Sequence, residues 1–216
     1  MRVIKVVSSL LLVLSTVLAG DMSYLVKFSV NLGPQNHDSF LVRINPSWAP
    51  LGAERFKELV EGNGRGIYRV LCDILFVENF FDAARFFRVV PGFMAQFGIS
   101  AKPDRAAYWR EKKLKDDPVL KSNTRGYISF ATSGPNSRTT QMFINYADNA
   151  NLDSMGFAPF GLVEKGMDVV DKIYAGYGEK PDQQSIQMSG NKYLKKHFPK
   201  LSYIEKVEIV SADSDL

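Results

Sequence analysis

The chain has 216 residues, of which 45% are hydrophobic and 23% charged, and its formal net charge is +4 at pH 7. With 12% aromatic residues, this composition supplies a hydrophobic core and excludes a mainly disordered chain. A single cysteine, Cys72, excludes a disulfide scaffold. The two histidines, His37 and His197, lie at unrelated positions and outside any nucleophile motif. We therefore expect neither a zinc site nor a Ser-His or Cys-His hydrolase.

Residues 1–20 have the features of a secretory signal peptide. Two basic residues lead into an apolar stretch from Val6 to Leu18, and the small residues Ala19 and Gly20 follow. Because a spanning helix needs about 20 apolar residues, we expect cleavage and export to a lumen, a periplasm or the cell exterior, with an uncleaved anchor as the alternative. Without this segment 25 basic residues face 23 acidic ones, so the net charge falls to +2. That charge is a weak argument for nucleic-acid binding, and we expect none.

The apolar pattern of the remaining chain predicts mainly strands, with a few separate helices. Tyr24, Val26 and Phe28 alternate with other residues as in a half-buried strand, whereas the apolar residues of 50–61 have helical spacing. In chain order we expect a hairpin of strands 24–30 and 40–44, a helix over 50–61, strand and loop over 86–93, strands 127–131 and 142–144, helices 167–173 and 183–198, and a last strand over 203–210. This succession favours a closed or nearly closed β architecture over alternating βαβ units, in one domain over 21–216.

Segment 62–80 interrupts this pattern as an insertion. Its apolar residues from Ile67 to Leu75 have the spacing of an amphipathic helix, although a strand explains so short a run nearly as well. The segment could bind a partner or a membrane surface, pack against the domain, or reflect an error in the coding sequence; packing is the interpretation we favour. Cys72 lies inside this segment and receives no role.

Three ordered blocks of sequence point to one family. Residues 86–98 read FFRVVPGFMAQFG, residues 131–144 begin ATSGPN and end QMFI, and residues 151–161 begin NLD and end FG. The blocks resemble those of the cyclophilins, whose signature core is F-H-R-V-I-P-G-F-M-x-Q-G-G. The resemblance covers residues 24–176 and the last strand. It implies a closed eight-stranded antiparallel β-barrel capped by two α-helices, with the C-terminal helix added, and peptidyl-prolyl cis–trans isomerase activity on proline-containing polypeptides.

The same resemblance assigns the site. Arg88 matches the family's catalytic arginine, a cation that hydrogen-bonds near the prolyl nitrogen. The positions that match the substrate-binding residues are Phe93, Met94, Gln96, Ala131, Thr132, Gln141, Phe143, Leu152 and Phe157. Such chemistry needs no nucleophile, metal or cofactor, and we expect a monomer.

Four positions depart from the family pattern. Phe87 and Phe157 stand where the family has histidines, Asn151 replaces a tryptophan, and Thr132 replaces an asparagine. Many bacterial and plant relatives also lack the tryptophan and the histidine at the rim of the pocket, so catalysis is not excluded. The tryptophan position contacts cyclosporin in the family, and we therefore expect weak binding of that drug. Residues 178–201 extend beyond the family core, and we expect their helix to pack on the barrel or to offer a partner surface.

Two other classes of function remain open. One is a non-catalytic cyclophilin-like module or chaperone that holds proline-containing segments. The intact set of Arg88, Phe93 and Gln96 argues against this module, whereas an insertion that distorted the barrel would favour it. The other is a structural or interaction protein that docks through segment 62–80 and the C-terminal helix. Neither alternative predicts turnover at proline.

Overall fold

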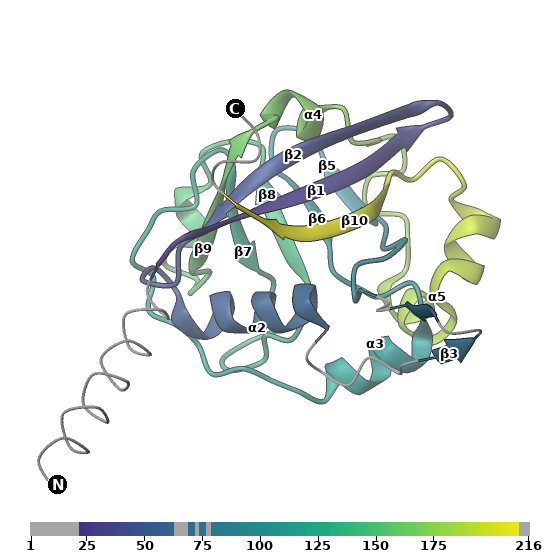
Figure 1. Ribbon diagram of the computed structural model, residues 1–216. Helices are drawn as coiled ribbons and strands as arrows, with labels where there is room; N and C mark the ends of the chain where they lie inside the picture. Colours follow the sequence, from purple (N-terminus) through teal and green to yellow (C-terminus); the bar gives the residue numbers. More distant parts are fainter. Residues whose placement is uncertain (1–21, 63–68, 72–73, 77–78, 212–216) are drawn as a thin grey trace, which may run out of the picture.

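The computed structural model of the protein describes residues 22–62, 69–71, 74–76 and 79–211 (Figure 1). Eight antiparallel strands form the main sheet: β1 (Tyr24–Gly33), β2 (Asn36–Ile44), β5 (Arg88–Val90), β6 (Met94–Phe97), β7 (Tyr127–Phe130), β8 (Met142–Asn145), β9 (Pro159–Lys165) and β10 (Tyr203–Val210). Their order across the sheet is β10-β1-β2-β9-β7-β8-β6-β5. The helices are α2 (Pro50–Glu61), α3 (Pro103–Arg110), α4 (Met167–Asp171), α5 (Gln183–His197) and a 3₁₀ turn, η1 (Ala150–Leu152).

The sheet curls into a half-barrel, and the expectation of a closed barrel is wrong. Strands β10 and β5 are its two edges, and among the described residues they share no ladder. The segment just before β5 contacts β10 through an isolated bridge between Arg85 and Tyr203 and a hydrogen bond of 3.1 Å from Phe86 N to the Ser202 carbonyl. Ile204 on β10 adds two backbone hydrogen bonds: its carbonyl accepts from Ala83 N at 2.9 Å, and its N–H donates to the Ala84 carbonyl at 2.8 Å. Strand β5 itself is only three residues long, and the residues that hydrogen-bond to β10 precede it in the chain.

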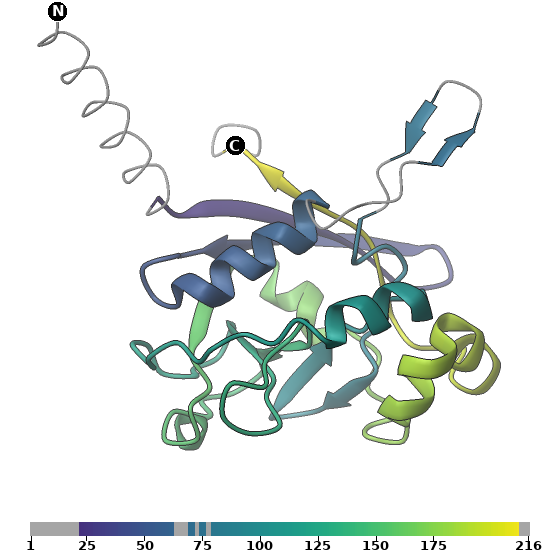
Figure 2. The same cartoon turned by 90° about the horizontal axis from the view of Figure 1, so that it is seen from below.

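The hydrophobic core lies between the inner face of the sheet and α2. Ala53, Phe56, Leu59 and Val60 supply the buried stripe of α2, as the helical spacing predicts, and Gly62 ends the helix in a left-handed conformation. The Phe56 ring packs 5.4 Å from that of Phe160 on β9. Burial of such a side chain contributes roughly 1.5–3 kcal/mol, so this stripe fixes α2 beneath the sheet (Figure 2).

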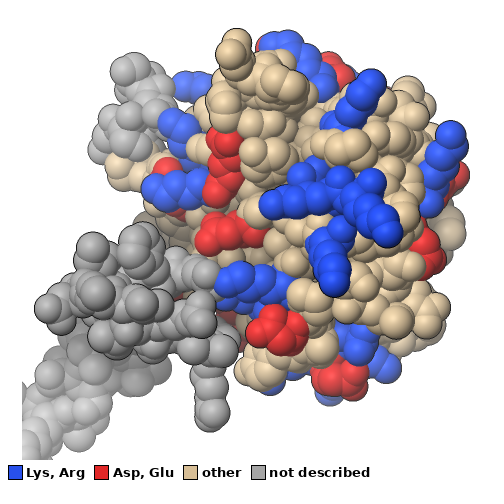
Figure 3. All heavy atoms as spheres, turned by 90° about the vertical axis from the view of Figure 1, so that its right-hand side faces the viewer, with Lys and Arg blue, Asp and Glu red and all other residues tan. Residues whose placement is uncertain are grey.

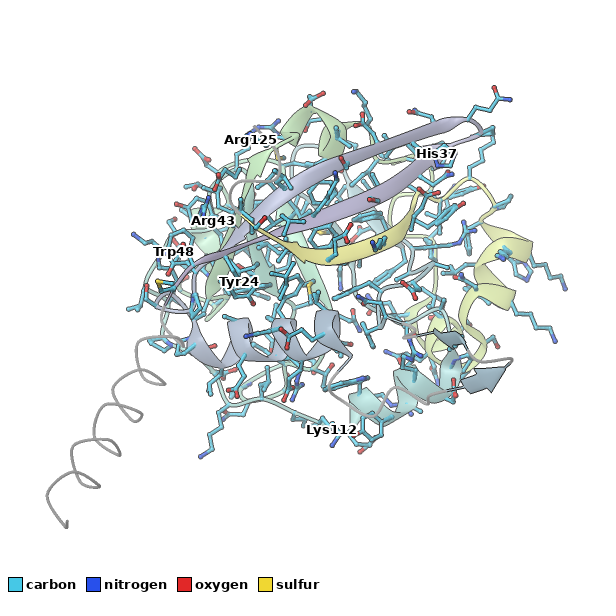
Figure 4. All side chains as sticks on the ribbon, viewed as in Figure 1. Tyr24, His37, Arg43, Trp48, Lys112 and Arg125 are labelled. Atoms are coloured by element: carbon cyan, nitrogen blue, oxygen red, sulfur yellow. The ribbon has the colours of Figure 1, made fainter. Side chains whose placement is uncertain are left out.

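Side-chain hydrogen bonds complete the attachment of α2. Tyr24 on β1 donates from its hydroxyl to the Ala53 carbonyl at 3.2 Å, and Figure 4 shows the ring between strand and helix. Burial raises the pKa of this phenol, and the nearby Glu61 carboxylate adds to the effect. At the helix N-terminus, Asp117 accepts hydrogen bonds from the backbone N–H groups of Leu51 and Gly52 at 3.0 and 2.9 Å.

The strands predicted for the main sheet are all present, and so are the helices predicted over 50–61, 167–173 and 183–198. The observed ends differ from the predicted ones by a few residues. The sequence did not reveal α3, which buries only Ala106 and Trp109 and so lacks an apolar stripe. It also did not reveal β9, whose Pro159 and Gly161 are unusual in a strand.

Within the insertion, the helix interpretation is wrong for the residues that the structure describes. Strands β3 (Arg69–Leu71) and β4 (Ile74–Phe76) pair antiparallel as a separate two-stranded sheet, which extends away from the body of the protein in Figure 2. The order of the eight main strands is therefore unaffected by the insertion. Cys72 lies outside the described residues.

Helix α5 belongs to the extension before the last strand. Its Ile186 and Leu194 are buried in a second apolar cluster with Phe87, Ile99 and Ala106, which places α5 beside α3. A kink at Gly190 lets the Asn191 N–H donate to the Ala101 carbonyl at 3.1 Å. Exposed basic residues occupy its last turn, where cations stabilise the carbonyl end of a helix. Lysine and arginine side chains gather on this face of the protein in Figure 3.

The described part of the chain contains no helix that is both long enough and apolar enough to cross a membrane. The predicted signal peptide, residues 1–20, lies outside the described residues.

Candidate active site

Three adjacent strands carry one row of site residues. Arg88 on β5 pairs directly with Gln96 on β6, and Gln96 in turn pairs with Phe143 on β8. Because side chains alternate across a strand, the neighbours Ala95 and Phe97 lie in the core, while the row lies on the opposite face of the sheet. Adjacent pairs in such a row lie about 5 Å apart, so register alone brings an arginine, an amide and an aromatic ring together.

A chain of hydrogen bonds orients the polar groups of this row. Arg88 Nη1 donates to Gln96 Oε1 at 3.2 Å, and Gln96 Nε2 donates to Gln141 Oε1 at 2.9 Å. Gln96 is only 6% exposed, and these two hydrogen bonds give both ends of its buried amide a partner within the protein. The guanidinium carbon lies 6.0 Å from the centre of the Phe93 ring. The cation is therefore held at the edge of an apolar surface.

That apolar surface is a small cluster separate from the main core. Met94, Phe143 and Leu152 are buried in it, and Phe93 and Phe157 pack against it half-buried. The Phe143 and Phe157 rings meet edge to face, with centroids 5.6 Å apart. Such an arrangement presents ring faces and edges to a ligand and suits an apolar ring of the size of proline.

All ten residues that the sequence assigned to the site surround one cavity of about 450 Å³. The lining comprises Arg88, Phe93, Met94, Gln96, Ala131, Thr132, Gln141, Phe143, Leu152 and Phe157. Sequence reasoning missed the other lining residues, which are Arg110, Lys113, Ser133, Ser137, Thr139, Gln183 and Gln187. Ser133, Ser137 and Thr139 lie between predicted site residues, and this proximity could have identified them. The remaining four belong to α3, α5 and the turn after α3, outside the three blocks.

Glu179 is a further residue at the site that sequence reasoning missed. Its Oε1 accepts a hydrogen bond of 2.6 Å from Arg88 Nε and also contacts Nη2 of the same guanidinium. The two residues are 91 positions apart in the sequence, and Glu179 lies in the extension rather than in a motif.

Buried amides hold the backbone around the cavity. Asn149 Nδ2 donates to the Phe93 carbonyl at 2.9 Å, and Asn123 Nδ2 donates to the Phe157 carbonyl at 2.8 Å. Asn123 is fully buried and also donates to Asp153 from its backbone and its side chain. Two aromatic residues of the cavity are thus fixed through their carbonyls by side chains that do not line it.

The Asp153 carboxylate anchors this amide network. Burial alone would raise the pKa of Asp153, but hydrogen bonds from Ser122 and from the side chain and backbone of Asn123 outweigh it, so the pKa falls below its ordinary value. The carboxylate is the form that the network binds.

One glycine is essential to the wall of the cavity. Gly98 has φ of +98°, and a Cβ atom there would lie 2.3 Å from the Thr140 carbonyl oxygen and 2.9 Å from Gln141 Cα. The Thr140 hydroxyl donates to the Gly98 carbonyl at 2.8 Å. This close approach of two backbones sets the position of Gln141 at the end of the Arg88–Gln96–Gln141 chain.

The structure accounts for one of the departures from the family pattern and places the other three. Phe87 is 1% exposed and packs under α5, so an apolar ring at this position serves the extension. Asn151 is exposed on η1, next to the buried Leu152. The other two substituted positions, Thr132 and Phe157, both line the cavity.

Comparisons with known proteins agree with this geometry. Residues 26–191 match the family model described as cyclophilin type peptidyl-prolyl cis-trans isomerase. A peptidyl-prolyl cis-trans isomerase of Acinetobacter baylyi is 35% identical over 76% of this chain and 77% of its own length. Peptidyl-prolyl cis-trans isomerase A of Dickeya dadantii is 47% identical over 44% of this chain and 53% of its own length.

The fold has a solved counterpart as well. The crystal structure of a cyclophilin type peptidyl-prolyl cis-trans isomerase of Cryptosporidium parvum superposes with a TM-score of 0.56 at 18% identity, over 88% of this chain and 99% of that one. At this identity the likeness concerns the fold alone. Together with the family match over most of the chain, it establishes that this protein belongs to the cyclophilin-type peptidyl-prolyl cis–trans isomerases.

Proposed function

We propose that Arg88 is the catalytic residue of this isomerase and that the cavity beside it binds the X-Pro segment of proline-containing polypeptides. The observation that carries the proposal is the chain of hydrogen bonds from Arg88 through Gln96 to Gln141, at the edge of the apolar cluster. It holds a cation beside a surface that fits a prolyl ring.

The reaction is rotation about the amide bond that precedes proline. Amide resonance gives this bond a barrier of ~18–20 kcal/mol, and uncatalysed X-Pro rotation takes tens to hundreds of seconds. Rotation becomes easier when the prolyl nitrogen turns pyramidal and its lone pair leaves conjugation with the carbonyl. An N–H donor of Arg88 aimed at that lone pair stabilises the twisted amide more than the planar one, which is the condition for catalysis. No covalent bond forms or breaks.

The remaining site residues hold the substrate while the bond rotates. We assign the prolyl ring to the apolar surface of Phe93, Met94, Phe143, Leu152 and Phe157. The Gln141 side chain and the segment of Ala131 and Thr132 form the side of the cavity that suits the backbone flanking the proline. Anchoring on both sides lets the acyl part of the bond turn against a fixed ring.

Magnitudes limit the share of the rate that Arg88 supplies. Each factor of ten in rate needs about 1.36 kcal/mol. A hydrogen bond to a charged group contributes about 1.5–3 kcal/mol, which corresponds to one or two factors of ten. Any further acceleration comes from desolvation of the amide and from binding of the twisted geometry by the apolar surface.

The main rival is a module that binds proline segments without turning them over. Such a module needs the apolar surface but no oriented cation, whereas here Arg88 is held from two sides. The insertion would favour the rival if it distorted the sheet, yet β3 and β4 pair apart from the eight main strands. An exchange measurement on a short X-Pro peptide separates the two: the isomerase accelerates cis–trans exchange, whereas the module binds the peptide at an unchanged exchange rate.

We also propose that the protein assists folding in an exported compartment and acts as a monomer. The support for export is the arrangement of basic, apolar and small residues in segment 1–20. N-terminal sequencing of the protein recovered from expressing cells tests it. A new N-terminus at Gly20 or Asp21 supports export, and an intact Met1 contradicts it. Light scattering of the purified protein tests the monomer, which predicts the mass of one chain.

Weak cyclosporin binding is the last part of the proposal. Asn151 stands at the position where the family's tryptophan contacts the drug, and its side chain offers far less apolar surface than an indole. Titration calorimetry tests this expectation, and tight binding in the nanomolar range would contradict it.

A further inference from the structure

Arg88 is held from two directions, and one of its partners lies outside the cavity. Gln96 accepts from Nη1 on the cavity side. Glu179 accepts from Nε at 2.6 Å and contacts Nη2 through the same oxygen. Glu179 does not line the cavity and instead lines a separate surface hollow with Val90 and Pro91.

Backbone hydrogen bonds fix the loop that carries Glu179. Val89 N on β5 donates to the Gly178 carbonyl at 3.2 Å, and within the loop Gly178 N donates to the Ala175 carbonyl at 2.9 Å. Gly178 has φ of +54°, the left-handed region in which glycine carries no steric penalty. Glu179 directly follows Gly178, so a turn that is hydrogen-bonded to β5 places it beside Arg88 on the same strand.

These contacts fix the orientation of the Arg88 guanidinium, because its N–H donors lie in one plane. A guanidinium has five N–H groups in one plane: one on Nε and two on each terminal nitrogen. The Glu179 carboxylate accepts from Nε and contacts Nη2, and the Gln96 side-chain oxygen accepts one N–H of Nη1. Each terminal nitrogen carries a second N–H beyond those contacts. Fixing three points of a planar fork sets the direction of these remaining donors.

We propose that Glu179 is a positioning residue for Arg88: its carboxylate locks the guanidinium so that the remaining terminal N–H groups face the substrate amide. This inference rests on the catalytic role proposed for Arg88. A free arginine side chain samples many rotamers, and holding one in place before substrate arrives removes that cost from the reaction step. Glu179 therefore acts on the rate of rotation rather than on the affinity for the proline ring.

The ion pair contributes little to folding, so its role in the reaction can be isolated. The side chains of Arg88 and Glu179 are 33% and 60% exposed. Exposed pairs of this kind stabilise a protein little or not at all. We therefore expect Glu179→Gln and Glu179→Ala to leave the melting temperature of the protein unchanged, so any loss of activity reports on the site.

A matched control is available elsewhere in the chain. Glu164 on β9 pairs with Arg43 on β2, with exposures of 35% and 36%. None of the described residues that line the cavity comes from these two strands. Figure 4 labels Arg43, which lies near the end of β2 opposite to His37. Glu164→Gln removes the same charge from the same kind of pair, and we expect it to leave turnover unchanged.

The test is NMR exchange spectroscopy on an X-Pro peptide with the purified protein, which yields the interconversion rate on the enzyme and the peptide affinity separately. We expect Glu179→Gln to lower the interconversion rate about fivefold, equivalent to ~1 kcal/mol at 1.36 kcal/mol per factor of ten. Glu179→Ala should lower it further, because a glutamine oxygen still accepts one hydrogen bond. Affinity should change by less than about twofold in both variants. We expect the Nε–H resonance of Arg88 to be sharp in the native protein and broadened in both variants.

Two results would overturn the proposal. One is a Glu179→Gln protein that turns over the peptide as fast as Glu164→Gln or faster, because the pair would then be passive or inhibitory. The other is an equal loss of rate on adding Glu179→Gln to an Arg88→Ala protein, because the glutamate would then act independently of the arginine. A different result would contradict the proposed catalytic role of Arg88: the Arg88→Ala protein alone would retain full turnover.

Discussion

Gln96 lies directly opposite Arg88 in the ladder between β5 and β6, and its Oε1 accepts a hydrogen bond of 3.2 Å from Arg88 Nη1. The buried amide of Gln96 thereby connects the cation on the edge strand to Gln141, which also lines the cavity. The polar part of the site depends on this one register, because a slip of one residue would move Gln96 to the core face.

The first prediction concerns Gln96 itself. Replacement by alanine removes both hydrogen bonds and leaves Gln141 Oε1 without its donor. We expect the fold to persist and kcat/KM to fall by about tenfold, since hydrogen bonds to charged groups contribute ~1.5–3 kcal/mol. Turnover of an X-Pro peptide measures the effect, with circular dichroism as the check on folding. Full activity in a folded Gln96→Ala protein would show that the chain of hydrogen bonds is dispensable.

The second prediction concerns Gly98. A methyl group at this position would collide with the Thr140 carbonyl oxygen, and the left-handed φ adds strain. We expect Gly98→Ala to lower the free energy of unfolding by roughly 2 kcal/mol or more and to displace Gln141, so that activity falls as well. Urea denaturation and peptide turnover test the two effects. Gly126→Ala is a useful comparison, because there a Cβ would be no closer than 3.3 Å to a neighbour, a flexible leucine side chain.

The third prediction concerns the pH dependence of stability. The pKa of Asp153 is lower in the folded protein than its ordinary value of 3.8, because the hydrogen bonds of Ser122 and Asn123 outweigh burial. The folded state therefore binds this proton less tightly than the unfolded state does. The stabilisation from Asp153 is complete above pH 3.8 and is lost as the pH falls through the lower, folded-state value.

Asp153→Asn tests that assignment. We expect the variant to be less stable than the native protein at neutral pH and to lose less stability on acidification below the ordinary pKa of aspartate. Thermal unfolding at a series of pH values gives both curves. Parallel curves for the two proteins across the acid range would contradict the assignment.

The fourth prediction concerns a buried ion pair outside the site. Arg138 Nη1 donates to Asp117 Oδ2 at 3.0 Å, and the two side chains are 2% and 1% exposed. Asp117→Ala would leave the arginine buried without this partner and would also uncap α2. We expect a loss of about 3–5 kcal/mol in unfolding free energy. Asp117→Ala combined with Arg138→Met should recover part of it, and a double variant as unstable as Asp117→Ala alone would argue against the pair as the cause.

The sequence predicted the lining of the cavity because its residues come in short contiguous blocks. Arg88, Met94 and Gln96 share one hairpin, β5 and β6, and Phe143 continues their row on β8. In such a hairpin the order of residues along the chain determines which side chains share a face. A motif match in these blocks therefore carries the geometry of the site with it.

The partners that come from outside the blocks could not be predicted in this way. Glu179 reaches Arg88 across 91 positions of the chain, through a turn that is anchored by the hydrogen bond from Val89 N to the Gly178 carbonyl. Arg110 is the last residue of α3, and Lys113 lies shortly after it. This helix has too few buried residues to produce an apolar pattern in the sequence. These contacts are decided by tertiary packing, about which local periodicity carries no information.

The prediction of a closed barrel was wrong for a related reason. The family resemblance implies eight antiparallel strands, and the sheet has that number. Closure, in contrast, depends on how many residues of β5 and β10 come into register, and here the bridge at Arg85 and Tyr203 is isolated. Ala83 and Ala84 exchange backbone hydrogen bonds with Ile204 on β10, but they precede β5 and do not lengthen its ladder. The Arg85 guanidinium donates to the Leu201 carbonyl at 2.9 Å.

The most direct test of the account is the exchange rate of an X-Pro peptide measured with the native protein and with Arg88→Ala side by side. The arginine is a third exposed, so the variant should remain folded. We expect catalysed exchange by the native protein and a rate lower by one to two factors of ten in the variant, at similar peptide affinity. Equal exchange rates in the two folded proteins would contradict the role of Arg88, and with it the mechanism proposed for this isomerase.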